Sequence, residues 1–424
     1  MNIFSDNLKV LISSSGLNFL FRIIGLGTSF LIVFIISNLF GIENYGNFSL
    51  IFTITQAIAM IFALGIPNAL ILLIGNKNLS NREAKVLLFK GIKITLLLSI
   101  LPIIVLFFGA EFIATTVFNN SNLILFLKMG AITIPFFIIH ELFLYYFIAI
   151  KRFLTYNIFM FGLPNLLLGI FLFLFYAVGK SDFYTFLAFT ISIILLVITE
   201  FLVTYEAKLS NIENTIPTKK LIKTASPMMF SGLLLFLLNW TDVIMLGMLV
   251  DEAQVGIYNI AYKIGSVGFL VIVSVSTFIT PKMAELYGKG AMEELKKLIH
   301  NATRLILILS IPLVSILVIF SKFILSFFGT LAITGSATLI IVAIGVLFSA
   351  ISGNVDQILN MTNHQKILKN ITIVCFLVNV TLNYILIPIY GINGAAIASL
   401  VSNIVINLLC IYYIKKKLGF YTLF

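Results

Sequence analysis

Apolar residues occur along the chain in twelve long runs that are separated by short polar gaps. A helix needs about 20 mainly apolar residues to cross the hydrocarbon core of a membrane, and each run is long enough to do so. The pattern therefore predicts an all-α membrane protein with twelve transmembrane helices. The runs are residues 17–39, 48–75, 88–109, 124–150, 156–178, 183–205, 225–249, 258–281, 304–328, 334–360, 367–388 and 393–414.

Lysine and arginine are distributed unevenly between the gaps. Most of the 27 Lys and Arg residues lie in every second gap, and Lys180 is the one that lies in the gaps between. Short loops rich in these residues stay on the cytoplasmic side of a membrane. We therefore expect both termini in the cytoplasm. The opposite loops, which hold acids such as Glu43 and Glu111, are expected outside.

Composition agrees with a membrane protein. The chain is 60% hydrophobic and 10% charged, whereas about a quarter of the residues in a soluble domain are charged. The formal net charge of +11 would suggest nucleic-acid binding in a soluble protein. Here the positive residues lie in loops beside the membrane, so orientation and anionic lipid headgroups account for them, and no nucleic-acid partner is expected.

The sequence holds few groups typical of enzymes. Cys375 and Cys410 both lie inside apolar runs, and no CxxC or His/Cys spacing suggests a metal site. No P-loop, nucleophile elbow, HExxH or dinucleotide-binding glycine pattern is present. We therefore expect neither catalysis nor a bound cofactor, and the energy for any transport must come from a gradient or from the substrate.

The two halves of the chain resemble each other. A shift of 210 to 214 positions places Gly46 on Gly256, Pro67 on Pro281 and Gly179 on Gly391. Six helices per half give both halves the same orientation, as in parallel transporter repeats. We expect a six-helix lobe at 1–205, a cytoplasmic linker at 206–224 and a second lobe at 225–424. Two such lobes around a central cavity are typical of transport by alternating access.

Polar residues inside the predicted helices are candidates for that cavity, because in membranes such groups face protein or water. Arg22 lies more than a turn inside its run, so its side chain can extend only part of the way to the lipid headgroups. Lys263 and Lys322 lie nearer the outer ends of their runs, and their side chains can extend to the headgroups. Ser, Asn and Gln residues that recur on one helix face either join helices by hydrogen bonds or line a hydrated pathway. The candidate substrate-binding residues are Arg22, Lys263, Lys322, Asn18, Gln56 and Asn239.

Three acids are candidates for carrying a coupling ion, H⁺ or Na⁺: Asp242, Glu141 and Asp356. Asp242 lies more than a turn inside its run, and Asp356 lies in the cytoplasmic third of its run. Glu141 is either a proton carrier or a locally paired structural acid. We interpret Glu200 as structural and His140 as a packing and hydrogen-bonding residue.

Four segments, in this order, resemble the Wzx-type polysaccharide flippases of the multidrug/oligosaccharidyl-lipid/polysaccharide exporter superfamily. The resemblance extends over nearly the whole chain. The segments are Ser37–Phe48, Ser226–Gly247, Gly256–Tyr262 with Pro281, and Asn383–Ala396.

The resemblance implies a function. Members of that family move undecaprenyl-diphosphate-linked oligosaccharides from the cytoplasmic to the periplasmic leaflet of the bacterial inner membrane, for O-antigen or capsule assembly. It implies that the first, second, seventh and eighth helices line the cavity. Our hypothesis is that Arg22, with Lys263 and Lys322, meets the diphosphate. Amide and hydroxyl side chains would then meet the sugar. The implied partners are the lipid-linked oligosaccharide, membrane lipids, and the polysaccharide polymerase and chain-length machinery.

Two other functions remain open from the sequence. A multidrug cation antiporter of the same superfamily would need an acidic and aromatic cavity, and the acids and cations inside these helices are nearly balanced. A membrane-embedded glycosyltransferase or polymerase would need a sizeable loop or domain carrying charged catalytic residues, for which the short outer loops leave little room.

Overall fold

The computed structural model describes residues 6–76, 79–179, 181–205 and 216–422, and every regular element in these ranges is helical. Side chains at 6–19, 76, 182, 227–228, 230–239, 278 and 281 lie outside this description. The chain divides into two compact units, Met1–Phe236 and Leu237–Phe424. The boundary falls inside one helix, α10 (Thr218–Leu249).

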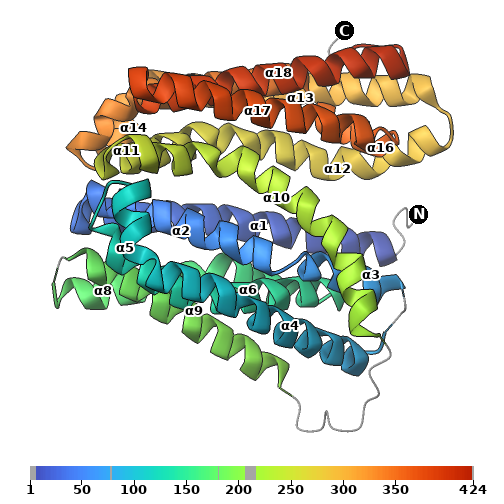
Figure 1. Cartoon of the computed structure of the whole chain (residues 1–424). Coiled ribbons are helices and arrows are strands. Elements are labelled where there is room, and N and C mark those ends of the chain that lie inside the picture. Colours follow the sequence, from blue (N-terminus) through green and yellow to red (C-terminus); the bar gives the residue numbers. More distant parts are fainter. Residues whose placement is uncertain (1–5, 77–78, 180, 206–215, 423–424) are drawn as a thin grey trace. The chain divides into compact units, whose positions relative to one another are not determined.

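The first unit consists of long helices joined by short turns (Figure 1). Besides the first part of α10, its elements are α1 (Asp6–Ile35), the π-helical turn η1 (Ile36–Phe40), α2 (Ile42–Phe62), α3 (Ile66–Asn76), α4 (Asn81–Phe108), α5 (Ala110–Phe112), η2 (Ile113–Val117, π), α6 (Leu123–Ala149), α7 (Phe153–Asn157), η3 (Ile158–Gly162, π), α8 (Leu163–Tyr176) and α9 (Asp182–Thr204).

The second unit has the same character. After the last part of α10 it contains α11 (Glu252–Gly265), the 3₁₀ turn η4 (Ser266–Gly268), α12 (Phe269–Gly288), α13 (Met292–Ile319), α14 (Ser321–Ser326), η5 (Thr330–Gly335, 3₁₀), α15 (Ser336–Ser352), α16 (Val355–Met361), α17 (Gln365–Tyr390) and α18 (Ile392–Leu418).

Eleven helices in the described ranges are long and apolar enough to cross a membrane, so the predicted class of multi-pass, all-α membrane protein is confirmed. The remaining predicted run, 225–249, lies within α10. The apolar part of α10 whose side chains are described is Trp240–Leu249, which is shorter than a span.

Two predicted runs are broken at a glycine in the structure, and the run 304–328 is divided at Phe320 between α13 and α14. The run 48–75 is two helices, because Leu64 and Gly65 have positive φ and Pro67 stands at the second position of α3, where its missing N–H costs nothing. The run 334–360 is likewise divided between α15 and α16 at Gly353, with φ of +78°. Apolar composition alone does not reveal such breaks, because both sides of each break are equally hydrophobic.

In the first unit α6 is the central helix. It packs against α2, α3, α4 and α9, and Figure 1 shows α4, α6 and α9 side by side. Aromatic side chains line the contacts: Phe143 of α6 meets Phe201 of α9 with ring centroids 4.9 Å apart, and the ring of Phe89 of α4 lies 5.9 Å from that of Phe201. Edge-to-face and stacked pairs of this kind contribute about 0.5–1.5 kcal/mol each beyond their buried area.

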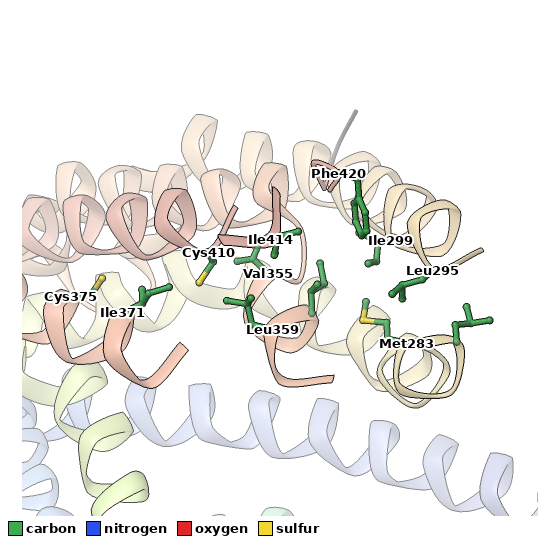
Figure 2. Close-up of a cluster of buried hydrophobic side chains, with 12 residues drawn as sticks. Met283, Leu295, Ile299, Val355, Leu359, Ile371, Cys375, Cys410, Ile414 and Phe420 are labelled. Carbon is green, nitrogen blue, oxygen red and sulfur yellow. The ribbon is translucent and has the colours of Figure 1, made fainter. Parts of the chain in front are cut away.

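In the second unit α18 packs against α15, α16 and α17. Figure 2 shows an apolar cluster where the ends of several helices meet, with Leu359, Cys410 and Ile414 among its fully buried members. Cys375 and Cys410 are both free thiols buried in this cluster, so they serve as small apolar packing groups.

Candidate functional site

A buried carboxylate lies where four helices of the second unit meet. Asp242, on α10, is 3% exposed. Its Oδ1 accepts hydrogen bonds from the Asn383 amide at 2.6 Å and the Asn379 amide at 3.3 Å. Its Oδ2 accepts from the Tyr258 hydroxyl at 2.7 Å and from the Ser399 hydroxyl. Four donors from three other helices therefore converge on one acid.

Two helical hairpins bring these residues together. Asp242 and Tyr258 each lie eight residues from Val250 in the turn between α10 and α11. Asn383 and Ser399 each lie eight residues from Gly391 in the turn between α17 and α18. Eight helical residues rise about 12 Å, so both pairs lie about 12 Å from the turns of their hairpins.

The two turns are built to be tight. Asp251 caps α11 by accepting a hydrogen bond from the Gln254 backbone amide at 2.8 Å. Gly391 has φ of +55° and ψ of −133°, a conformation that favours glycine. A β-carbon at this position would lie 2.9 Å from the Gln254 Oε1, so the second turn also passes close to the first turn of α11.

The carboxylate is surrounded by neutral groups. The four side chains that reach it in the described structure are a tyrosine, two asparagines and a serine, none of which carries charge at neutral pH. Hydrogen bonds favour the ionised form, but an ionised acid held by neutral donors keeps one buried negative charge, which is costly in a membrane. Binding one small cation removes that cost.

The oxygen atoms around Asp242 suit such a cation. Carboxylate, amide and hydroxyl oxygens are the ligands of hard cations. Besides the two carboxylate oxygens, the cluster holds the amide oxygens of Asn379 and Asn383 and the hydroxyl oxygens of Tyr258 and Ser399. The Asn383 Oδ1 is buried and accepts no hydrogen bond within the described part of the chain. It is thus available as a ligand.

A cavity of about 190 Å³ adjoins the cluster, and Asn379 and Ser399 line it. A water molecule occupies about 30 Å³ in the liquid, so the cavity has room for several. Its polar wall offers them hydrogen-bonding partners. The rest of the wall consists of Tyr262, Phe269, Val342, Gly345, Cys375, Ala396, Leu400, Ser402, Asn403 and Ile406.

A second polar layer fixes one wall of the cavity. Asn403 of α18 donates to the Gly345 carbonyl of α15 at 3.1 Å, and its own Oδ1 accepts from Ser349 at 2.8 Å and from Asn407 at 2.6 Å. These bonds hold α15 and α18 in register. The cavity is therefore part of a packed arrangement and is not a gap left by poor packing.

The other predicted coupling acids occupy different environments. Glu141 is partly buried in α6 of the first unit. Asp356 is exposed in the first turn of α16, 4 positions after Ser352, the last residue of α15. Of the three acids, Asp242 is the one whose carboxylate accepts hydrogen bonds from four side chains.

The predicted substrate-binding residues are spread over both units. Arg22 is exposed on α1, and Gln56 of α2 is partly buried with its Oε1 buried and without a hydrogen bond in the described structure. In the second unit Lys263 is partly buried in the last turn of α11, and Lys322 is exposed on α14. The side chains of Asn18 and Asn239 lie outside the described residues.

Sequence reasoning missed the partners of Asp242. Asn379 and Asn383 are four positions apart on α17, a spacing that puts both on one helix face, and this signal was available. Tyr258 and Ser399 carried no comparable signal. Within the described residues no group of three or more His, Cys, Asp or Glu side chains forms a metal cluster.

The fold is similar to that of solved membrane transporters. The chain superimposes on an inward-facing multidrug resistance MATE family transporter of the MOP superfamily with a TM-score of 0.79 and 14% identity, over 93% of this chain and 94% of that one. It superimposes on the lipid II flippase MurJ, in an inward closed conformation, with a TM-score of 0.75 and 18% identity, over 96% of this chain and 87% of that one. At these identities the likeness shows the fold alone.

The chain belongs to the polysaccharide biosynthesis protein family, whose model matches residues 11–287. A second family model, MatE, matches residues 227–385. The resemblance to polysaccharide exporters expected from the sequence is therefore confirmed at the level of the family.

Two curated relatives come from Haloferax volcanii. The chain is 26% identical over 179 residues to the probable low-salt glycan biosynthesis flippase Agl15, and 27% identical over 181 residues to the probable flippase AglR. Each match covers 42% of this chain and 38% of the relative, so the chain is aligned with well under half of either protein.

Proposed function

We propose that the protein is a flippase that moves a lipid-linked oligosaccharide across a membrane. The observation that carries the proposal is the match of residues 11–287 to the polysaccharide biosynthesis protein family in a chain with a multi-pass transporter fold. The flippase names of the two archaeal relatives and of one structural neighbour support it.

The proposed substrate is an undecaprenyl-diphosphate-linked oligosaccharide that moves from the cytoplasmic to the periplasmic leaflet of a bacterial inner membrane, for O-antigen or capsule assembly. The charge distribution of the loops supports an orientation with both termini in the cytoplasm. In this proposal a polysaccharide polymerase and its chain-length machinery use the product on the far side.

The charge of the diphosphate determines which groups the passage must contain. About two negative charges cannot cross the hydrocarbon core without solvation, so they need a hydrated route lined by cationic side chains, while the lipid tail stays in the bilayer. Arg22 is our first candidate for the diphosphate, because its guanidinium binds phosphate in a bidentate manner and its side chain is exposed in the first unit. The further candidates are Lys263 and Lys322 for the diphosphate, and Gln56, Asn18 and Asn239 for the sugar.

Two energy sources are proposed. With the cytoplasm negative, moving two negative charges outward releases about 4–5 kcal/mol per 100 mV, since each charge contributes about 2.3 kcal/mol. In addition, H⁺ or Na⁺ binding at Asp242 drives the return of the empty carrier. The oxygen cluster around Asp242 and the adjoining cavity support this second source.

Deletion of the gene tests the function. The expected result is loss of surface polysaccharide and accumulation of a lipid-linked oligosaccharide that is accessible only from the cytoplasmic face, both restored by the wild-type gene. Normal surface polysaccharide in the deletion strain, with no accumulated intermediate, would refute the proposal.

The second candidate is a multidrug cation antiporter. The match of residues 227–385 to the MatE model and the buried acid of the second unit favour it. An antiporter predicts that the deletion strain becomes sensitive to lipophilic cations while its polysaccharide is unchanged. A flippase predicts the reverse, so the same strain separates the two functions.

The coupling ion is tested with purified protein in vesicles held at a fixed membrane potential. A Na⁺ gradient and a pH gradient are imposed separately, and flipping is measured for the wild type and for Asp242→Asn. We expect one gradient to change the wild-type rate and to have no effect on the variant. Equal responses of wild type and variant to both gradients would remove Asp242 from the proposal.

A further inference from the structure

A second buried pair of ionisable side chains lies in the first unit. The His140 Nδ1 of α6 and the Glu200 Oε1 of α9 are 2.7 Å apart. His140 is 8% exposed and Glu200 is fully buried. The sequence predicted a hydrogen-bonding role for His140 and a structural role for Glu200, and the hydrogen bond is present.

Aromatic side chains pack beside the pair. Phe201, next to Glu200 on α9, contacts Phe143 and Phe89. The second carboxylate oxygen, Glu200 Oε2, is buried and accepts no hydrogen bond in the described structure. A pair that served only to join α6 and α9 would be expected to use both carboxylate oxygens, because an unsatisfied buried acceptor costs about 1–3 kcal/mol and more when it is charged.

Other titratable groups lie on α6, on α9 and on the helices packed against them. Glu141 follows His140 directly and is close enough to interact with it electrostatically. On α4, Lys85 is buried and Lys90 donates to the Ile216 carbonyl at 2.7 Å. The remaining titratable groups on these elements are Glu43 and Tyr45 of α2, Arg82, Glu83 and Lys93 of α4, Glu111 of α5, Lys128, Tyr145 and Tyr146 of α6, Tyr156 of α7, Tyr176 of α8, and Asp182 and Tyr184 of α9.

We propose that His140 and Glu200 form a proton-binding site that is separate from Asp242 and exchanges one proton during transport. With one proton shared between them, as imidazolium and carboxylate or as imidazole and carboxylic acid, the pair is neutral. Without that proton the pair carries one buried negative charge. The two states differ by one charge in an apolar environment, so a change in hydration or in the neighbouring charges shifts the balance between them.

Glu200 lies near one end of α9. Glu200 lies four residues before Thr204, the last residue of α9, which corresponds to about 6 Å along the helix. The unpartnered Oε2 is the atom to which a proton or a bridging water can bind. No covalent bond between heavy atoms changes in the step, because a proton is taken from water at one time and returned to water at another.

This inference rests on the proposed function for its role in transport, but proton binding itself is measured without substrate. The chain has three histidines, of which His300 and His364 are assigned with the variants His300→Asn and His364→Asn. The probe is protein labelled with ¹⁵N at histidine, in lipid nanodiscs, with the ring nitrogen shifts followed as pH is varied. Thr199→Val is the matched control, because Thr199 lies next to Glu200 and donates to the Leu196 carbonyl of its own helix.

In the wild type and in Thr199→Val we expect the His140 ring-nitrogen shifts to report the gain and loss of one proton by the pair as pH is varied. In Glu200→Gln, which keeps the size and a hydrogen-bonding group, this response should be lost or changed. An identical His140 titration in the wild type and Glu200→Gln would overturn the proton site. If Glu200→Gln does not fold, His140→Gln takes its place, because it removes the histidine of the pair.

The role in transport is measured at fixed potential in vesicles. The response of flipping to a pH gradient should be abolished in Glu200→Gln and retained in Thr199→Val, while any response to a Na⁺ gradient is retained in both. An unchanged response to pH in Glu200→Gln would overturn the role in transport. Absence of glycan flipping by the wild type would instead refute the proposed function and leave the histidine titration to decide the proton site.

Discussion

The Asn383 amide donates a 2.6 Å hydrogen bond to the Asp242 carboxylate, although 141 positions separate the two residues in the chain. This bond joins α10 to α17, and the bonds from Tyr258 and Ser399 add α11 and α18 to the same acid. One carboxylate thus links four helices of the second unit. A cation that binds there would change the contacts of both hairpins at once.

The first prediction concerns cation-dependent stability. A ligand that binds only the folded protein stabilises it by about 2.7 kcal/mol when present at 100 times its dissociation constant. We therefore expect the melting temperature of the wild type in detergent to rise with the concentration of the coupling cation. Asp242→Asn lacks the negative charge and should show no such rise. A rise of equal size in the variant would mean that the cation binds elsewhere.

The second prediction compares two serines of α18. Ser399 donates to the Asp242 carboxylate, whereas Ser402 donates to the Ala398 carbonyl of its own helix. Because hydrogen bonds to charged groups contribute about 1.5–3 kcal/mol, Ser399→Ala should lower the free energy of unfolding by that amount. Ser402→Ala removes the same atom from the same helix and should cost clearly less. Chemical denaturation of both variants checks the difference, and equal costs would contradict the assigned role of Ser399.

The third prediction concerns the turn between α17 and α18. Gly391 has a positive φ, and a β-carbon there would crowd the Gln254 Oε1. We expect Gly391→Ala to lower the free energy of unfolding by about 1–2 kcal/mol, the cost of a left-handed backbone with a side chain. Gly288→Ala is the control, since a β-carbon there meets nothing within 4 Å and φ is not positive. Thermal unfolding of the two variants gives the comparison.

The fourth prediction concerns the diphosphate. If Arg22 binds it, Arg22→Ala should reduce surface polysaccharide about tenfold at normal expression, which corresponds to the loss of about 1.4 kcal/mol of interaction. Arg82→Ala is a matched control, because Arg82 is likewise exposed but lies in the first turn of α4, in a stretch that we expect at the cytoplasmic surface. A wild-type amount of surface polysaccharide in the Arg22→Ala variant would show that Arg22 does not bind the diphosphate.

Much of the fold could be predicted from the sequence, because apolar length and the distribution of Lys and Arg are properties of single segments. The breaks at Gly65 and Gly353 could not be located, since they depend on the backbone conformation of one glycine within a continuous apolar stretch. The depth of Asp242 in its run predicted a functional role for this acid, which stays a prediction.

The ligands of Asp242 were not predictable in the same way. Nothing in the local sequence distinguishes Ser399 from Ser402, and the difference arises because Ser399 lies as far from Gly391 as Asn383 does. The pairing of His140 with Glu200 likewise depends on the packing of α6 against α9, which periodicity does not encode. To predict which residues distant in the chain form a contact, the register of the packed helices must be known. That register is a property of the folded unit.

The central claim is that this chain flips a lipid-linked oligosaccharide, and reconstitution tests it most directly. The purified protein is placed in vesicles with a fluorescent diphosphate-linked oligosaccharide, and the fraction of that lipid accessible from outside is followed with time. The account predicts exchange between leaflets that depends on the protein, is faster under a membrane potential of the correct sign, and is slowed in Asp242→Asn. Exchange no faster than in protein-free vesicles, with folded wild-type protein present, would contradict it.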